Sequence, residues 1–230
     1  MYKQSEPETI RALFGSIAAN YDRGNAISSF GLHYYWNREL IRAVGSPLSL
    51  LDLCAGTGEI AFGVLKKNPQ TGAILLDFCP EMLKVAEARG NHLRSRFSTL
   101  QADAQAIPLS DQSVDAVTIA YGIRNVENPE KCFQEVLRVL KPKGRFGILE
   151  LTRPKTLVPR LGASCYTRYC VPFLGKLVAG NFKAYQYLAR SVATFAPPEI
   201  LVEQLQKSGF QQIKQKSLTL GIATLLIAAK

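Results

Sequence analysis

The sequence predicts an α/β protein with a doubly wound, mainly parallel sheet. Short apolar runs of strand length alternate with longer segments whose apolar residues recur at helical spacing, which is the pattern of successive βαβ units. The runs are apolar throughout, as expected for strands that helices cover on both faces. Acidic residues lie in or just after three successive runs, where an open sheet of this kind binds its ligands.

The first half of the chain supplies helices and four strands. Residues 1–45 are expected to be helical, with aromatic side chains at intervals, and Gly45-Ser46-Pro47 ends them. Pro80 suits the first turn of a helix that runs towards Gly90. Strands are predicted over 48–53, 73–76, 97–101 and 114–121, and a further helix over 59–67.

The second half interrupts this alternation. A helix that begins at Asn128-Pro129-Glu130 leads to a predicted turn, Lys141-Pro142-Lys143-Gly144, and to a fifth strand over 145–151. Residues 152–196 are basic, aromatic and interrupted by proline and glycine, so we interpret them as an inserted lid. The chain then continues with a helix over 197–208 and two strands over 210–216 and 218–228, which we expect to form an antiparallel hairpin at the sheet edge.

Length and composition suit one α/β domain. The 230 residues can bury a sizeable core, and a hydrophobic content of 47% is ordinary for a soluble globular protein. The N-terminus lacks the apolar stretch of a signal peptide, and no apolar run approaches the ~18–20 residues that span a bilayer, so residence in the cytoplasm is expected. The five cysteines lack zinc-type spacing. We expect no metal site and interpret the cysteines as buried small hydrophobic residues in a reducing compartment.

The positive charge is concentrated in one part of the chain. The net charge is +10, and residues 141–190 contain ten lysines and arginines against one acid, Glu150. Such a segment suits nucleic acid, an anionic membrane surface or an acidic ligand, although a solvated face gives the same pattern.

A glycine turn, Gly56-Thr57-Gly58, follows the first predicted strand and precedes a helix. Glycines let a ligand approach the backbone closely, and the helix N-terminus offers N–H donors. Taken alone, this turn fits a dinucleotide as well as other adenosine cofactors.

Acids at three successive strands favour S-adenosylmethionine as the cofactor. Asp52 can meet the ammonium of a methionyl group, and Asp77 can accept both ribose hydroxyls. Asp103 can accept the exocyclic amine of adenine, while the Ala104 N–H can bond a ring nitrogen. Asp77 would serve either cofactor class, whereas Asp103 would be superfluous for a nicotinamide cofactor. An acid-lined site suits a sulfonium cation, although each acid alone can equally be a helix cap or a solvated loop residue.

These predictions divide a single domain, 1–230, into four parts. They are an N-terminal helical cap (1–45), a cofactor-binding core (46–151), a basic aromatic lid (152–196) and a C-terminal helix with hairpin (197–230).

With these residues in view, the chain resembles the C-methyltransferases of quinone biosynthesis, the demethylmenaquinone and polyprenyl-methoxy-benzoquinol methylases. The resemblance covers nearly the whole length, and its most specific motif is Tyr121-Gly122-Ile123-Arg124-Asn125-Val126. Other matching stretches are Phe14 to Asp22 with Asn25, Ser29 to His33 with Trp36, Arg138 to Arg145, Leu149-Glu150, Tyr185 to Val192, Phe195 to Pro197 and Gly209-Phe210.

This resemblance implies the class I fold of S-adenosylmethionine-dependent methyltransferases, with a seven-stranded sheet, and a cofactor site at Thr57, Asp77 and Asp103-Ala104. The chain departs from the family pattern in three places. Ala120 stands where serine is frequent, Lys143 stands where glycine is usual, and the segment 222–230 lacks the usual ending with His or Arg before Gly-Tyr.

Transfer of a methyl group to a quinol ring carbon requires a hydroxyl that has lost its proton, so the site needs a base or a cation that stabilises the phenolate. We predict Arg124 as the stabilising cation, Asn125 as the group that orients the ring oxygens, and Tyr21 or Asp22 as the proton acceptor or relay. The alternatives are a salt bridge from Arg124 to Glu127 or Glu150 and packing of Tyr21 over the cofactor.

The expected reaction is the conversion of demethylmenaquinol to menaquinol, with methylation of the polyprenyl-methoxy-benzoquinol of the ubiquinone pathway as the alternative. A polyprenylated quinol lies in the membrane, so residues 152–196 are predicted to contact an anionic membrane surface. No nucleic-acid partner is expected, although an RNA or other small-molecule methyltransferase of the same fold, a nicotinamide-dependent oxidoreductase and a non-catalytic cofactor-binding protein are rival interpretations. The oligomeric state stays open, with a homodimer as one option.

Overall fold

A computed structural model of the chain describes residues 7–174 and 181–230, so the predictions for 1–6 and for 175–180 lie outside the described residues. Its centre is one seven-stranded sheet of strand order β3-β2-β1-β4-β5-β7-β6. The first five strands of this order run parallel, and β7 is antiparallel to both of its neighbours. The strands are β1 (Ser49–Leu53), β2 (Gly72–Asp77), β3 (Phe97–Gln101), β4 (Val114–Ala120), β5 (Leu140–Leu151), β6 (Gln211–Leu218) and β7 (Ala223–Ala229). The predicted doubly wound sheet and its C-terminal hairpin are confirmed.

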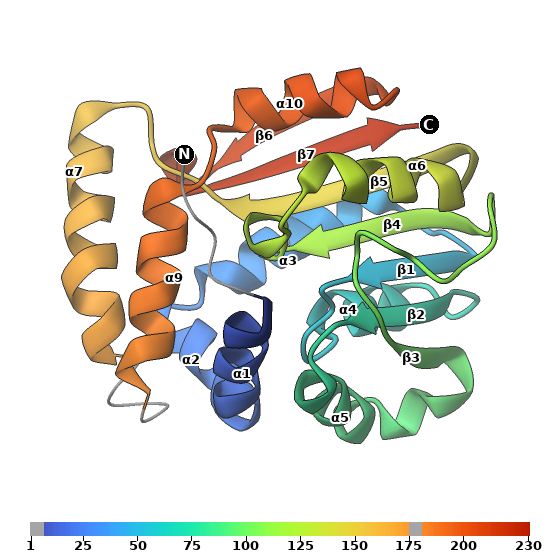
Figure 1. Cartoon of the computed structure of the whole chain (residues 1–230), viewed down its shortest axis with the longest axis horizontal. Coiled ribbons are helices and arrows are strands. Elements are labelled where there is room, and N and C mark those ends of the chain that lie inside the picture. Colours follow the sequence, from blue (N-terminus) through green and yellow to red (C-terminus); the bar gives the residue numbers. More distant parts are fainter. Residues whose placement is uncertain (1–6, 175–180) are drawn as a thin grey trace.

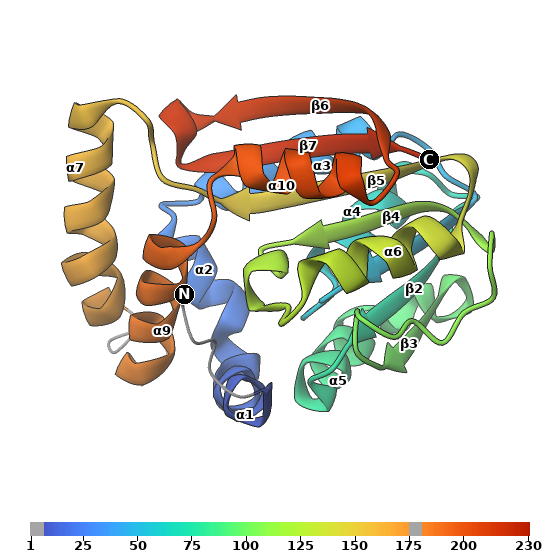
Figure 2. The ribbon, with the colours of Figure 1, turned by 45° about the horizontal axis from the view of Figure 1, so that its top comes forward.

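Helices cover both faces of this sheet. One face carries α3 (Leu32–Val44), α4 (Glu59–Lys67) and α5 (Pro80–Arg89), and the other carries α6 (Pro129–Val139) and α10 (Pro198–Lys207). Figure 2 shows α6 and α10 together across the face that is turned forward. Proline occupies the first turn of α5, α6 and α10, where its missing N–H costs nothing, and the Asn128 side chain caps α6 by accepting from the Lys131 N–H.

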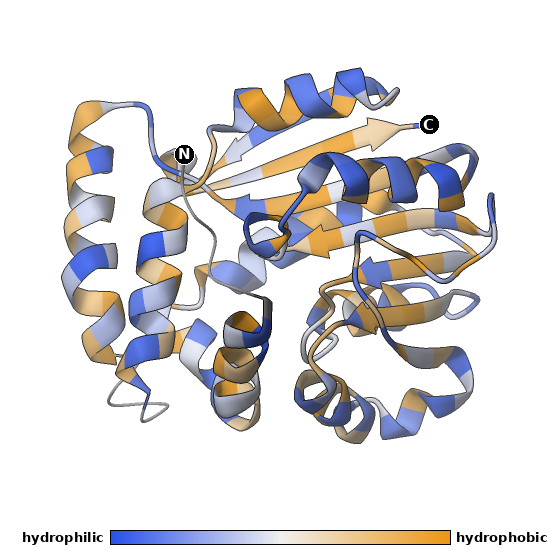
Figure 3. Cartoon of the chain, viewed as in Figure 1, coloured by the Kyte–Doolittle hydropathy of each residue, from blue (hydrophilic) through white to orange (hydrophobic). Residues whose placement is uncertain are grey.

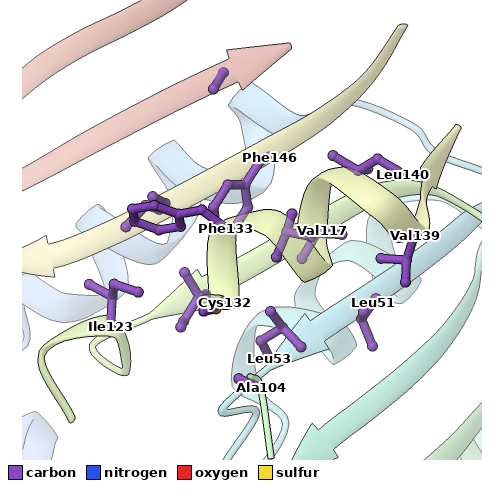
Figure 4. Close-up of a cluster of buried hydrophobic side chains, with 14 of the residues drawn as sticks. Leu51, Leu53, Ala104, Val117, Ile123, Cys132, Phe133, Val139, Leu140 and Phe146 are labelled. Carbon is purple, nitrogen blue, oxygen red and sulfur yellow. The ribbon is translucent and has the colours of Figure 1, made fainter. Parts of the chain in front are cut away.

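Alternate residues of each central strand enter two separate cores. In β1, Leu51 and Leu53 face α6, whereas Leu50 faces α3 and α4. Figure 4 shows the first core, where Phe133 and Phe146 pack between α6 and the sheet with their ring centroids 6.0 Å apart. The hydrophobic colouring of β4, β5 and β7 in Figure 3 agrees with strands buried on both sides.

Two strand boundaries differ from the prediction. The predicted turn Lys141-Pro142-Lys143-Gly144 lies inside β5, which begins at Leu140. It forms an irregularity against β4, because Val114 pairs with Leu140 and Ala116 already pairs with Arg145. Lys143 takes a positive φ of 65° there, so the chain bulges and returns to its ladder rather than ending it. In the hairpin, a short 3-10 turn at Thr219–Gly221 makes the reversal, later than predicted.

The first part of the cap and the lid lie together beyond one end of the sheet, whereas α3, the last helix of the cap, covers a face of the sheet. The cap contains α1 (Pro7–Ile17), the 3-10 turn η1 (Ala18–Asn20), α2 (Tyr21–Ser28) and α3. The described part of the lid contains α7 (Leu157–Cys165), the π-helix η4 (Tyr166–Cys170) and α9 (Phe182–Thr194). In Figure 1 the arrowheads of β1, β4 and β5 point towards the side on which α1, α2 and α9 lie. The carboxyl ends of the parallel strands therefore meet the cap and the lid. No helix among the described residues is long and apolar enough to cross a bilayer.

The expectation that the cysteines are buried is wrong for two of them. Cys79 and Cys132 are buried and Cys54 is half-buried, whereas Cys165 and Cys170 are exposed on the lid. The helices that carry these two thiols also expose large apolar side chains. Apolar neighbours in the sequence therefore do not predict burial in this part of the lid.

Candidate active site

The glycine turn connects β1 to α4 at the carboxyl edge of the sheet. Gly56 and Gly58 take positive φ angles of 54° and 80°, which glycine adopts without strain. A Cβ at Gly58 would lie 2.5 Å from the Phe62 side chain and 2.8 Å from that of Leu75, so a larger residue would force these two side chains to move. The turn thus presents bare backbone and the N-terminus of α4 to the edge of the sheet.

Asp77, at the end of β2, holds this turn. Its Oδ2 accepts from the Gly56 N–H at 2.8 Å, and its Oδ1 accepts from the Cys79 N–H at 2.9 Å. Burial raises the pKa of Asp77 to about 6, although these backbone donors oppose the shift. The Phe78 N–H is a third backbone donor to this carboxylate, which has about four acceptor positions, so a ribose hydroxyl can still bind to it.

Asp103 and Ala104 follow β3 on the same edge. The Asp103 carboxylate is exposed and accepts from the Gln105 N–H at 2.9 Å and from its side-chain amide. The Gln105 Oε1 in turn accepts from the Asn128 N–H at 2.9 Å, which ties this loop to the start of α6. Ala104 is buried against the first core. The two residues predicted to recognise adenine are therefore neighbours of Asp77 along one edge.

Asp52 lies deeper than the other acids. Its side chain points to the α4 face, where Oδ1 accepts from the Thr118 hydroxyl at 2.6 Å and Oδ2 from the Ala61 N–H at 3.2 Å. Only 1% of the residue is exposed, and burial raises its pKa to about 7. Both carboxylate oxygens have protein partners, so the predicted contact with an ammonium group stays a prediction.

The cap is fastened to the glycine turn through Asp22. The Thr57 hydroxyl donates to Asp22 Oδ1 at 2.6 Å, and Arg89 donates to Oδ2 at 2.8 Å. Thr57 itself is 2% exposed. Tyr21 comes next to this contact, because one of its ring carbons lies 4.0 Å from the position that a Cβ on Gly56 would take. The tyrosine ring therefore packs beside the turn, and its packing over the cofactor stays a prediction.

A cavity of about 660 Å³ lies between the cap and the lid, within the usual range of small-molecule sites. Its lining is mainly apolar and aromatic, and it includes Tyr21, Trp36, Tyr121, Tyr166 and Tyr187. Two residues of the motif Tyr121 to Val126, Tyr121 and Arg124, line this cavity. The cavity is hence closed on one side by the loop that follows β4.

Arg124 and Asn125 lie in the 3-10 turn η3 (Ile123–Asn125) directly after β4. The Arg124 guanidinium forms a buried ion pair with Glu150 of β5, and the side chains of both residues are at most 3% exposed. Burial raises the pKa of Glu150, while the adjacent guanidinium opposes that rise. The salt bridge that the sequence offered as an alternative role for Arg124 is thus present, and Arg124 also lines the cavity.

His33 is a cavity residue to which the sequence argument assigned no role in catalysis. Its Nδ1 lies 2.8 Å from the Ser29 hydroxyl, and its Nε2 lies 3.7 Å from the Glu59 carboxylate without a hydrogen bond. Burial lowers the pKa of His33, so the neutral imidazole is the main form near pH 7. The packing of α3 against α4 places His33 beside Glu59. The motif Ser29 to His33 indicated that this segment resembles the family, but it gave no role for the imidazole.

Seven parallel and antiparallel strands in this order, a glycine turn after β1 and acids at the following strand ends define a class I S-adenosylmethionine-dependent methyltransferase. A solved structure of an S-adenosylmethionine-dependent methyltransferase from Aquifex aeolicus has the same fold, with a TM-score of 0.61 at 16% identity over 84% of this chain and 88% of that one. Within the described residues, no group of three or more His, Cys, Asp or Glu side chains could hold a metal ion.

The model of the ubiE/COQ5 methyltransferase family matches residues 2–230, and the chain belongs to this family. It is 44% identical to the demethylmenaquinone methyltransferase of Protochlamydia amoebophila, over the whole of this chain and 98% of that protein. It is 42% identical to the demethylmenaquinone methyltransferase of Chlamydia pneumoniae, over 98% and 99% of the two chains. The predicted resemblance and the cofactor class are confirmed.

The raised pKa of Asp77 predicts a pH-dependent cofactor affinity. A ribose donates two hydrogen bonds to an ionised carboxylate, so binding favours the deprotonated form. Below about pH 6 the free enzyme carries a proton on Asp77. The affinity for S-adenosylhomocysteine, measured by titration calorimetry between pH 5 and 8, should fall up to about tenfold per pH unit below pH 6. Asp77→Asn should bind at least about tenfold more weakly at pH 8 and lose this slope, and a wild-type slope retained in the variant would remove Asp77 from the ribose site.

Proposed function

We propose that this enzyme methylates a ring carbon of demethylmenaquinol and so forms menaquinol. The supporting observation is the mainly aromatic cavity that adjoins the cofactor edge and carries Arg124 in its wall. Full-length relatives that are named demethylmenaquinone methyltransferases support the naphthoquinol over the benzoquinol as acceptor.

In the proposed cofactor site, the glycine turn and Asp77 hold the ribose, and Asp103 with Ala104 holds the adenine. Acids of this neighbourhood compensate the positive sulfonium, although the whole chain has a net charge of +10. When bound, S-adenosylmethionine supplies an electrophilic methyl group for in-line displacement. The cap and the lid would hold the acceptor carbon in line and exclude water from it.

Arg124 would stabilise the phenolate form of the quinol. Because Glu150 balances its charge, the guanidinium acts through directed N–H donors rather than through net charge. Such donors are already oriented by the ion pair, so little reorganisation is needed when negative charge develops on the ring oxygen.

The proton of the quinol hydroxyl needs an acceptor other than Tyr21. Burial raises the pKa of Tyr21 above its usual value, so the phenol stays protonated at neutral pH and can donate but not accept a proton as a base. Asp22 binds Thr57 and Arg89 and is not among the residues that line the cavity. The neutral imidazole of His33 is chemically suited to the task, and it lines the same cavity.

The test of the function is an assay of the purified enzyme with both reduced acceptors side by side, each with a short prenyl tail. We expect demethylmenaquinol to be methylated with a kcat/KM at least about tenfold above that of the benzoquinol, which corresponds to about 1.4 kcal/mol of transition-state discrimination. Comparable values would assign both pathways to this enzyme. Methylation of neither acceptor would overturn the proposal.

Arg124→Lys tests the role of the guanidinium while it keeps a cation beside Glu150. A lysine lacks the planar fork of donors, so kcat should fall on the order of 10²-fold, while the affinity for S-adenosylhomocysteine changes little. Cofactor affinity from calorimetry is the control for folding. Near-normal turnover with unchanged cofactor binding would remove Arg124 from the mechanism.

The lid is proposed to contact the membrane that carries the quinol. Large apolar side chains are exposed along it, and several stretches of the α7 ribbon have the hydrophobic colour in Figure 3. Phe30 of the cap is 76% exposed, and its ring centroid is 5.5 Å from that of Tyr166, so the exposed surface continues from lid to cap. The exposed apolar residues of the lid are Leu157, Val158, Leu161, Tyr169, Phe173 and Phe182, and its exposed basic residues include Arg160, Arg168 and Lys183.

Vesicle binding should therefore depend on charge and salt. Each cation near an anionic surface contributes about 1 kcal/mol before screening, so vesicles with anionic lipid should bind the enzyme more tightly than neutral ones, and added salt should weaken the binding. The double variant Arg160→Glu with Arg168→Glu should lose most of the difference. The matched charge reversal Lys66→Glu with Lys67→Glu, on α4, should retain it. Equal partitioning onto neutral and anionic vesicles would contradict an electrostatic contact.

A further inference from the structure

Helix α9 of the lid carries the motif Tyr185 to Val192, to which the proposed chemistry assigns no role. Two of its polar side chains, Tyr187 and Ser191, are four residues apart and so lie on one face of the helix. Each of them is hydrogen-bonded to one of two consecutive residues after β4, Asn125 and Arg124. The contact therefore joins the lid to the loop that carries the candidate catalytic residues.

The contact of Tyr187 fixes the orientation of an amide. Its hydroxyl donates to Asn125 Oδ1 at 3.0 Å. Since a primary amide has its acceptor on one side and its two donors on the other, this bond turns the Asn125 Nδ2 donors away from Tyr187. Recognition of a quinol oxygen requires oriented donors of this kind, although Arg124 and Tyr187, and not Asn125, are among the residues that line the cavity.

The contact of Ser191 fixes the guanidinium plane. The Ser191 hydroxyl gives its proton to the Leu188 carbonyl at 2.9 Å, so its oxygen accepts from Arg124 Nε at 3.3 Å. Glu150 pairs with Nη1 of the same guanidinium. Because the group is planar, partners at Nε and Nη1 determine where its remaining N–H bonds point. Ser191 is 4% exposed, so water does not compete for this bond.

Helix α9 is itself held by the cap. Asn181 caps its start by accepting from the Ala184 N–H at 3.0 Å, and its amide donates to the Ser16 hydroxyl at 2.8 Å. Tyr185 packs against α2 so closely that a Cβ on Gly24 would lie 1.6 Å from its hydroxyl oxygen. These contacts with the cap fix the position of α9 independently of its contacts with the loop after β4.

We propose that Tyr187 and Ser191 are positioning residues that align Asn125 and Arg124 for the quinol. The proposal rests on the proposed function, because it assigns these two loop residues to the acceptor. Through Tyr187 and Ser191, the lid becomes part of the catalytic machinery. The donors of the loop are aligned when α9 is docked on the cap and lose their alignment when α9 leaves.

The first experiment measures the loop without using activity. Hydrogen–deuterium exchange followed by mass spectrometry should show faster exchange of peptides that cover residues 121–126 in Tyr187→Phe and in Ser191→Ala, at least about threefold relative to wild type. Peptides from β1 and β4 should be unchanged. Tyr35→Phe and Thr194→Val each remove one hydroxyl from a residue that makes no contact with the loop among the described bonds, and they should exchange like wild type. Unchanged exchange of the loop in both test variants would overturn the proposal.

The second experiment separates positioning from direct contact, because Tyr187 also lines the cavity. Tyr187→Phe should lower kcat about tenfold with KM for the quinol and affinity for S-adenosylhomocysteine within twofold. The double variant with Asn125→Ala should be no slower than Asn125→Ala alone, since Tyr187 acts through Asn125. Losses that multiply in the double variant would show independent action of Tyr187 and overturn the proposal. If wild type methylates no quinol, the proposed function fails, whereas the exchange experiment still tests the alignment of the loop.

Discussion

The buried ion pair between Arg124 and Glu150 is the interaction on which the organisation of the site depends. It joins the loop after β4 to the end of β5, and both side chains are withdrawn from water. Removal of one partner from such a pair costs about 3–5 kcal/mol, because the other charge stays buried without compensation. The pair therefore fixes the loop after β4, which carries the candidate catalytic residues, against the sheet. The lid then adds its own hydrogen bonds to the same loop through Tyr187 and Ser191.

A second constraint is the balance of charge at the carboxyl edge. The chain is strongly basic as a whole, yet Asp52 and Asp77 are buried beside the glycine turn, and their pKa values are raised to about 7 and about 6. Desolvation is the main cause of both shifts, and the charge of Asp77 adds to the shift of Asp52. A sulfonium cofactor would supply positive charge at this edge and favour their ionised forms. The lid sequence, in contrast, is basic without compensation, because residues 152–196 contain seven lysines and arginines and no acid.

Much of the fold follows from local patterns, and the exceptions have identifiable causes. The strands β1 to β4 and their helices were predicted within a few residues, because apolar runs and proline or glycine signals coincide there. The turn at Lys141 to Gly144 was misplaced. A bulge and a turn require the same residue types, and only pairing with Val114 and Ala116 distinguishes them. The burial of Cys165 and Cys170 was also misjudged, since the hydrophobic character of the lid does not say which way its helices face.

For the site, the sequence by itself determined the cofactor class, the acids at successive strand ends and the loop that carries Arg124. These depend on chain order, because the carboxyl ends of parallel strands must meet at one edge. Only the tertiary structure decided that Glu150 balances Arg124, that Asp52 lies beneath α4, and that His33, Tyr187 and Ser191 reach the cavity or its loop. Those contacts join residues distant in the chain, and their distances and directions arise from helix packing, which no local pattern records.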